Sequence, residues 1–305
     1  MPSNQNPLGA LPARFRRQRV LIVGCGDVGL RAARLLPTRV QVLALTSSAE
    51  RAPEFRAAGI KPLLGNLDQP SSLARLAGLA SRVIHLAPPP AQGQKDLRTQ
   101  ALMSTLRRRE LPAALVYGST SGVYGNCNGE WVSETRQANP QTPRAWRRVD
   151  AESGVRQLGR AGVRTSILRI PGIYAPDREG GTPRERLLKG TPVLVAEEDV
   201  FTNHIHADDL AHACVLALWR GRPQRVVNVS DDTDLRIGDY MDFAADLYGL
   251  PKPPRVTLAQ ATQALSPMQL SFMRESRRLD NQRMKLELRL RLAYPTVKQG
   301  LVEST

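Results

Sequence analysis

RVLIVGCGDVGLRAARLL, residues 19–36, is a short apolar run followed by three closely spaced glycines and a segment with helical spacing. The run ends at Val23 and consists of β-branched and other apolar residues, as in a strand buried on both faces. Gly24, Gly26 and Gly29 then form the pattern GxGxxG. A strand, this glycine pattern and a helix, in that order, predict the turn that binds a dinucleotide.

Each glycine of the turn has its own expected role. Gly24 makes the tight turn, Gly26 lets the backbone approach a diphosphate, and Gly29 lets the helix pack closely on the strand. Asp27 and Val28 fall in the first turn of the helix, whose free N–H groups and partial positive charge attract phosphates. We therefore expect all five residues to bind the diphosphate of a cofactor.

The residues after the second expected strand, VQVLALT (40–46), indicate which dinucleotide binds. An acidic residue at the tip of this strand would hold the ribose 2′-hydroxyl of NAD. The chain has Thr46, Ser47 and Ser48 there, and Arg51 follows within a turn. This arrangement would not repel a 2′-phosphate, and Arg51 could pair with it. We predict NADP, with NAD as the alternative. Ser47 or Ser48 capping the next helix is a second interpretation, compatible with the first.

Further apolar runs alternate with helical segments along the chain, a pattern that predicts an α/β fold with a parallel, doubly wound Rossmann-type sheet. In such a sheet, ligands bind at the carboxyl ends of the strands. The segments GNLD, APPP, GSTSG and PGIY should therefore line one crevice. The runs lie at residues 60–70, 81–90, 113–125, 164–176 and 225–232.

The expected organisation is a leader, a cofactor domain and a smaller C-terminal lobe. Residues 1–18 are polar and basic at their end, without the apolar core of a secretory signal, and are expected to be a flexible leader. Residues 19–175 form the predicted NAD(P)-binding domain, with a segment near 200–230 returning to it. Residues 176–305 mostly form the predicted substrate lobe.

Composition excludes several classes of protein. No apolar run approaches the roughly 20 residues that span a bilayer, and three widely spaced cysteines favour a reducing cytoplasm over a disulfide framework. The net charge is +15, but Lys supplies only six of the 43 basic residues and Arg is scattered through the chain. We interpret the charge as solvated faces rather than a specific nucleic-acid surface. The expected partner is a small-molecule substrate, and a homodimer stays open.

Taken together, the motifs resemble those of the extended and atypical short-chain dehydrogenase/reductases, the NAD(P)-dependent epimerase/dehydratase group. The resemblance runs from about residue 19 to about residue 301. It implies that Asn66 and Leu67 flank the adenine, that Ala87 and Pro88 lie by the nicotinamide ribose, and that Pro171 contacts the cofactor. The motifs are VGCGDVG, HLAPPP, YGSTSGVYG, LRIPGIYAP, NHIHADDLAHA, VVNVSDD and SRRLDNQRMKLEL with YPT.

The chain departs from this family at the catalytic positions. Active members use a Ser or Thr, a Tyr, and a Lys four residues after the Tyr. Thr120 matches the first, whereas Arg144 and Arg148 occupy the Tyr and Lys positions. A guanidinium cannot replace a phenol as proton donor, because it stays protonated above pH ~12. Arg148 could still donate to the nicotinamide ribose, as Lys would.

Either the proton chemistry has moved or it has been lost. Tyr124 and Tyr174 follow strands that should border the crevice, so each is a candidate donor or a packing residue. His204 and His206 alternate on one strand face, but two histidines without a third ligand make a poor metal site, and no metal is expected. Two functions remain. The first is an oxidoreductase or epimerase-like enzyme for an anionic small molecule such as a nucleotide sugar, with catalytic candidates Thr120, Tyr124, Arg144 and Arg148. The second is a catalytically silent NADP sensor.

Overall fold

The computed structural model describes residues 18–302, and the leader expected over 1–18 lies outside them except for Gln18. A seven-stranded sheet in the order β12-β7-β5-β4-β1-β2-β3 forms the centre of the cofactor domain. All of its neighbouring strands run parallel, which confirms the predicted α/β, Rossmann-type sheet. The strands are β1 (Arg19–Val23), β2 (Gln41–Thr46), β3 (Lys61–Leu64), β4 (Arg82–His85), β5 (Ala114–Thr120), β7 (Arg164–Ile170) and β12 (Arg225–Asn228).

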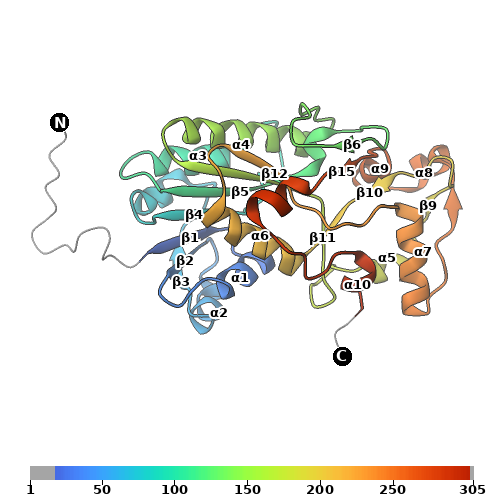
Figure 1. Ribbon diagram of the computed structural model, residues 1–305, viewed down its shortest axis with the longest axis horizontal. Helices are drawn as coiled ribbons and strands as arrows, with labels where there is room; N and C mark the ends of the chain where they lie inside the picture. Colours follow the sequence, from blue (N-terminus) through green and yellow to red (C-terminus); the bar gives the residue numbers. More distant parts are fainter. Residues whose placement is uncertain (1–17, 303–305) are drawn as a thin grey trace, which may run out of the picture.

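Helices cover both faces of the sheet, which explains why its central strands are apolar on both sides. Figure 1 shows α3 and α4 on one side and α1 and α6 on the other. Val20, Leu21 and Ile22 of β1 are fully buried, and they alternate between the two cores under these helices. The helical segments are α1 (Asp27–Arg34), η2 (Ala49–Arg51), α2 (Ala52–Ala57), η3 (Pro70–Leu76), α3 (Leu97–Leu106), η4 (Ser121–Tyr124), α4 (Pro143–Arg160) and α6 (Ala207–Arg220).

The remaining elements gather beyond the carboxyl ends of the sheet strands, at the right of Figure 1. A separate core around Tyr174, Val193, Tyr240 and Met241 holds much of this lobe together. Its helices are α5 (Arg184–Leu188), α7 (Ile237–Tyr248), α8 (Leu258–Ala264), α9 (Pro267–Met273) and α10 (Val297–Gly300). The short strands outside the main sheet are β6 (Trp131–Val132), β8 (Gly172–Tyr174), β9 (Val193–Leu194), β10 (Phe201–Thr202), β11 (His204–His206), β13 (Leu235–Arg236), β14 (Arg255–Val256) and β15 (Arg278–Leu279).

The chain crosses between the two parts more than once. After the first part of the lobe, α6 returns to pack against α1, and β12 joins the edge of the main sheet beside β7. The domain boundaries predicted from the sequence stay a prediction.

The leucine-rich segment near the C-terminus has conflicting periodicities in the sequence, and the structure resolves the conflict. Residues Met284–Leu288 form one turn of π-helix, labelled η5. Leu288 and Leu290 are buried, whereas Leu286 is 74% exposed. A π turn has a wider spacing than either a strand or an α-helix, so neither pattern could fit all the leucines.

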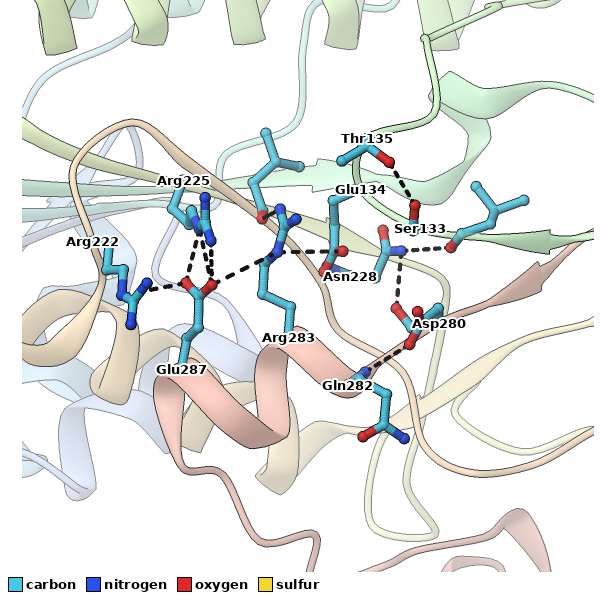
Figure 2. Close-up of polar contacts among 12 residues, drawn as sticks. Ser133, Glu134, Thr135, Arg222, Arg225, Asn228, Asp280, Gln282, Arg283 and Glu287 are labelled. Atoms are coloured by element: carbon cyan, nitrogen blue, oxygen red, sulfur yellow. Dashed lines mark hydrogen bonds and ion pairs between the residues drawn. The ribbon is translucent and has the colours of Figure 1, made fainter.

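Ion pairs fix this segment to the rest of the protein. Figure 2 shows Arg283 between Glu134 and Glu287, with Arg225 and Arg222 also paired with the Glu287 carboxylate. Glu134 also accepts a hydrogen bond from the backbone N–H of Asn228 at 3.0 Å. The network joins β12, the segment after β6 and the π turn. In residues 18–302, no helix has both the length and the apolar content needed to cross a membrane.

Candidate functional site

Three adjoining cavities form a continuous cleft along the carboxyl ends of the sheet strands. The strand-tip cavity, about 480 Å³, lies beyond β2 and β3. The central cavity, about 230 Å³, lies over the glycine turn. The lobe cavity, about 630 Å³, lies between α4 and the C-terminal lobe. The first two share Gly24, Gly26 and Leu86, and the last two share Thr120, Arg144, Pro171, Ile173 and Arg178.

The glycine turn forms the floor of the first two cavities. Gly24 has φ +82°, and a Cβ atom there would lie 2.3 Å from the backbone nitrogen of Ala87. At Gly26 a Cβ would meet nothing within 4 Å, so the backbone borders open space. At Gly29 it would lie 3.3 Å from the Gly24 carbonyl oxygen. The turn thus has a tight bend with a positive φ that only glycine adopts easily, an open approach and a close helix–strand contact, in the order of the three glycines.

Asp27 and Val28 begin α1 directly after the open position and line the central cavity. The Asp27 carboxylate lies beside two arginines. Its Oδ1 accepts from Arg31 Nε at 3.0 Å, and its Oδ2 is 3.4 Å from Arg178 Nε. The start of the helix therefore presents backbone donors together with a carboxylate whose charge Arg31 and Arg178 offset.

The strand-tip cavity contains all the residues predicted to select the cofactor. Thr46 Oγ1 accepts from the Ser48 N–H at 3.2 Å. Ser48 stands at the N-cap of η2, but its side chain makes no capping hydrogen bond, so the capping interpretation does not hold for Ser48. Arg51 donates to the Cys25 carbonyl at 3.0 Å and pairs with Glu54. The lining also includes Ser47, Asn66, Leu67, Ala87 and Pro88.

Arg148 is fixed at the inner wall of the central cavity. One terminal nitrogen, Nη1, donates to the Gly118 carbonyl at 2.7 Å and to the Tyr117 hydroxyl at 3.1 Å. The side chain is 8% exposed, and its buried Nε has no hydrogen-bond partner within the described residues. Because Arg148 also lines the central cavity, its guanidinium could donate further hydrogen bonds to a ligand there.

Arg144 lies one turn earlier on α4, and its side chain lines both the central and the lobe cavities. Desolvation, followed by the charges of Arg148 and Arg147, lowers the pKa of the Arg144 guanidinium. The guanidinium still stays protonated at neutral pH. The structure therefore brings Arg144 and Arg148 to the same cleft, as their four-residue spacing on a helix predicts.

The two hydroxyl candidates fall in different places. Thr120 ends β5 and lines both the central and lobe cavities, and its Oγ1 accepts from the Gly122 N–H at 3.2 Å. Tyr124 is only 1% exposed and does not line the cleft. Its hydroxyl donates to Asn228 at 2.7 Å, and Arg169 lies 4.6 Å from its ring centre. We therefore assign Tyr124 to packing rather than to proton transfer.

Tyr174, His204 and His206 also lie away from the cleft. Tyr174 makes edge contacts with both histidine rings, which confirms that alternation places the two histidines on one face. Burial lowers the pKa of His204 to about 4, so it is neutral at physiological pH. Across residues 18–302, His, Cys, Asp and Glu side chains form no group of three that could hold a metal ion.

Besides Arg144, the lobe cavity is lined by charged residues that no sequence motif indicates. Its guanidinium groups come from Arg144, Arg147, Arg178 and Arg277, and its one carboxylate comes from Glu275. Arg178 follows β8, whereas Glu275 and Arg277 lie between α9 and β15. No local motif marks these residues, because only the fold brings these separate segments together.

Glu275 lies close to Thr120 across Gly122. A Cβ atom built on Gly122 would lie 3.5 Å from Thr120 Oγ1 and 3.9 Å from Glu275 Oε2. The same Oε2 accepts from Arg277 at 2.7 Å, and Glu275 is only 11% exposed at its side chain. A carboxylate therefore lies in the same cavity as the hydroxyl that ends β5, with Gly122 between them.

Comparison with known proteins identifies one matching family, the NAD dependent epimerase/dehydratase family, over residues 20–230. Among curated proteins, none matches the chain. A functionally unknown conserved protein from Silicibacter pomeroyi DSS is 29% identical, with a TM-score of 0.77, covering 93% of this chain and 96% of that one.

Two solved enzymes share the fold at lower identity. UDP-glucose 4-epimerase from Thermotoga maritima, solved with UDP-glucose, is 18% identical with a TM-score of 0.76. UDP-glucuronic acid 4-epimerase from Bacillus cereus, solved with NAD, is 17% identical with a TM-score of 0.73. Each alignment covers 93% of this chain and 96% of the other. At these identities the likeness shows the fold.

Proposed function

This chain belongs to the NAD dependent epimerase/dehydratase family, and on that basis we propose that it is an NAD(P)-binding oxidoreductase or epimerase-like enzyme for an anionic small molecule such as a nucleotide sugar. The observation that carries the proposal is the continuous cleft from the glycine turn to an arginine-lined cavity. A dinucleotide needs the first two cavities, and its reactive end would face the third.

The residues of the first two cavities fit a dinucleotide. Gly26 leaves open space beside the backbone, and the α1 N-terminus supplies N–H donors for a diphosphate. Arg148 lines the central cavity, where its guanidinium fits ribose hydroxyls or another acceptor. When bound, the nicotinamide would accept or donate a hydride. The protein's part is to position it, with Ala87, Pro88 and Pro171 as further expected contacts.

We propose NADP as the preferred cofactor, with NAD as the alternative. No carboxylate stands at the tip of β2, and Arg51 borders the cavity there with its Nη1 on the Cys25 carbonyl. Glu54 pairs with Arg51 and reduces its net charge. A 2′-phosphate would compete with this exposed pair, which is weak by comparison with buried ones.

The charge of the lobe cavity supports an anionic substrate. Its four guanidinium groups outnumber its single carboxylate, so the cavity has a net positive charge. Guanidinium groups bind phosphate and carboxylate through paired hydrogen bonds. Two proteins of the same fold were solved with UDP-sugars, which makes these the first ligands to test.

We propose a new position for proton exchange in place of the absent tyrosine. Among the residues that line the lobe cavity, Glu275 supplies the one carboxylate, a group that can accept and return a proton, whereas a guanidinium stays protonated. Its carboxylate lies near Thr120. We assign it the proton exchange with a substrate hydroxyl, with the Thr120 hydroxyl as a second polar group in the same cavity.

A catalytically silent dinucleotide sensor is the second candidate, favoured by the arginines at the Tyr and Lys positions. Calorimetry with NAD(H) and NADP(H), followed by incubation of the NAD(P)-loaded protein with UDP-glucose and UDP-glucuronic acid, separates the two. An enzyme would change the 340 nm absorbance or yield an epimerised sugar. Dinucleotide binding with neither change for either sugar would favour the sensor, and failure to bind either dinucleotide at millimolar concentration would reject both.

A further inference from the structure

Arg178 lies where the central and lobe cavities meet and lines both of them. It comes from the loop between β8 and α5, at residues 175–183. Its Nη1 donates to the Ile173 carbonyl at 2.9 Å, and its Nε is 3.4 Å from Asp27 Oδ2. The side chain is 30% exposed, so it stays accessible to a ligand in the cleft.

The loop that carries Arg178 is held in place on its outer side. Backbone hydrogen bonds join Ala175 to Gly181 and Gly181 to Arg178. Next to Arg178, Asp177 pairs with Arg31 of α1 at 2.7 Å, and Asp208 at the start of α6 pairs with the same guanidinium at 2.6 Å. The loop is therefore fixed to α1 and α6, with Arg178 directed toward the beginning of α1.

The contact between Arg178 and Asp27 is poorly satisfied. Asp27 Oδ2 is buried and has no hydrogen-bond partner within the described residues, and its approach to Arg178 is an ion pair without a good hydrogen bond. Asp27 Oδ1 has a stronger contact with Arg31 Nε, at 3.0 Å. Losing Arg178 would leave the carboxylate paired with Arg31, so the Arg178 contact is the more easily exchanged of the two.

We propose that Arg178 binds the diphosphate of the dinucleotide, exchanging its contact with Asp27 for the phosphate oxygens. A diphosphate carries two negative charges, and the α1 N-terminus alone offers backbone donors and a partial charge. Asp27 would oppose a diphosphate at this position. Arg178 supplies a full positive charge there with several donors in a planar group. The inference rests on the proposed dinucleotide binding and adds a residue outside the glycine turn.

Arg178 would also connect the two halves of the cleft. Because its side chain forms part of both cavity walls, its contact with a diphosphate would alter the wall of the lobe cavity. The same loop would thus hold the cofactor and shape the space for the substrate.

Two substitutions break the same ion pair and have opposite expected effects. Arg178→Ala should weaken binding of NADP, NAD and ADP-ribose by roughly 10- to 100-fold, the size expected for hydrogen bonds to a charged group. Asp27→Asn keeps the backbone donor and removes the competing charge, so these affinities should stay equal or rise. Neither substitution should change the affinity for adenosine, which lacks phosphate, by more than about twofold. Arg184→Ala, an exposed arginine at the start of α5, is the matched control.

Calorimetry with these four ligands tests the proposal without any assay of turnover. If both variants lose dinucleotide affinity alike, Arg178 serves only to hold Asp27 and the proposal is wrong. An Arg178→Ala variant with unchanged dinucleotide affinity, or one that loses adenosine equally, also overturns it. If the wild-type protein binds no dinucleotide, both this proposal and the proposed function fall. Failure of Arg178→Ala alone leaves the proposed function standing.

Discussion

The Arg148 guanidinium donates to the Tyr117 hydroxyl at 3.1 Å, a contact that fixes the arginine against β5. Burial raises the pKa of Tyr117 to about 12, although Arg148 acts in the opposite direction. The phenol therefore stays neutral and accepts a hydrogen bond from the arginine. Tyr117 is fully buried and does not reach the cleft, so it positions Arg148.

Arg148→Ala should weaken NADP(H) binding by ~1.5–3 kcal/mol, the value of hydrogen bonds to a charged group. Tyr117→Phe should weaken it less, by roughly 0.5–1.5 kcal/mol, because the Gly118 carbonyl still holds the guanidinium. Calorimetric titration of both variants measures these losses. A change below ~0.5 kcal/mol for Arg148→Ala, typical of neutral surface substitutions, would contradict a role in cofactor binding.

Arg144→Ala should leave cofactor affinity nearly unchanged and weaken binding of an anionic substrate. Its guanidinium borders the lobe cavity as well as the central one, so we expect cofactor affinity to change by less than ~0.5 kcal/mol. Affinity for UDP-glucuronic acid should fall roughly tenfold or more. Titrating the sugar nucleotide into the NADP-loaded protein tests this, with Trp146→Ala on the exposed side of α4 as the control. Equal losses for both ligands would argue against the assignment.

Cofactor choice should depend on Arg51. We expect NADP to bind more tightly than NAD, and Arg51→Ala to remove most of the difference by weakening NADP alone. Glu54→Gln should increase the preference for NADP, because Glu54 pairs with Arg51 in the free protein. Parallel titrations of both dinucleotides measure the ratio. Equal or tighter binding of NAD to the wild type would reject the NADP proposal.

The glycine turn and the parallel sheet could be predicted from sequence because their signals are local. A strand buried on both faces, a positive φ at Gly24 and a helix start occur in consecutive residues. The position of Thr120 at the end of β5 follows from the same alternation of strands and helices.

The rest of the site could not be predicted because it depends on segments far apart in the chain. Glu275 lines the same cavity as Thr120 only because the chain after α9 folds back to the end of β5. Tyr124 follows the same strand as Thr120, but η4 directs it into a buried cluster with Asn228. A position near a strand end therefore correctly predicted that Thr120 borders the cleft, but wrongly suggested the same for Tyr124.

Asp231 should make stability fall as pH rises. Burial raises its pKa to about 7, so between the ordinary value of ~4 and pH 7 the folded state holds a proton that the unfolded state has lost. Stability from this group is fully present below pH ~4 and is lost as pH rises through 7, by at most ~1.4 kcal/mol per pH unit.

Asp231→Asn, which keeps the oxygen that accepts from the Thr233 N–H, should remove this dependence. Urea unfolding of both proteins between pH 5 and 8 gives the difference in the free energy of unfolding. Burial lowers the pKa values of His85 and His204 to about 3 and about 4, so these two histidines make stability rise with pH below pH ~6.5. Subtracting the variant from the wild type removes their contribution and leaves that of Asp231. A wild-type-minus-variant difference that is flat across this range would contradict the prediction.

Glu275→Gln should separate proton exchange from binding. The amide preserves the size of the side chain and can accept from Arg277, but it cannot take a proton. With a UDP-sugar that the wild type turns over, we expect the rate to fall by roughly 10²–10⁴-fold, the usual effect of losing a general acid or base. Cofactor affinity should stay unchanged, because Glu275 lines the lobe cavity and not the other two. Glu275→Asp should retain part of the rate, and Arg277→Lys controls for loss of the ion pair alone. Turnover by Glu275→Gln within threefold of the wild type would place the proton exchange elsewhere. Equal losses of turnover in Glu275→Gln and Arg277→Lys would mean that Glu275 only holds Arg277 in place.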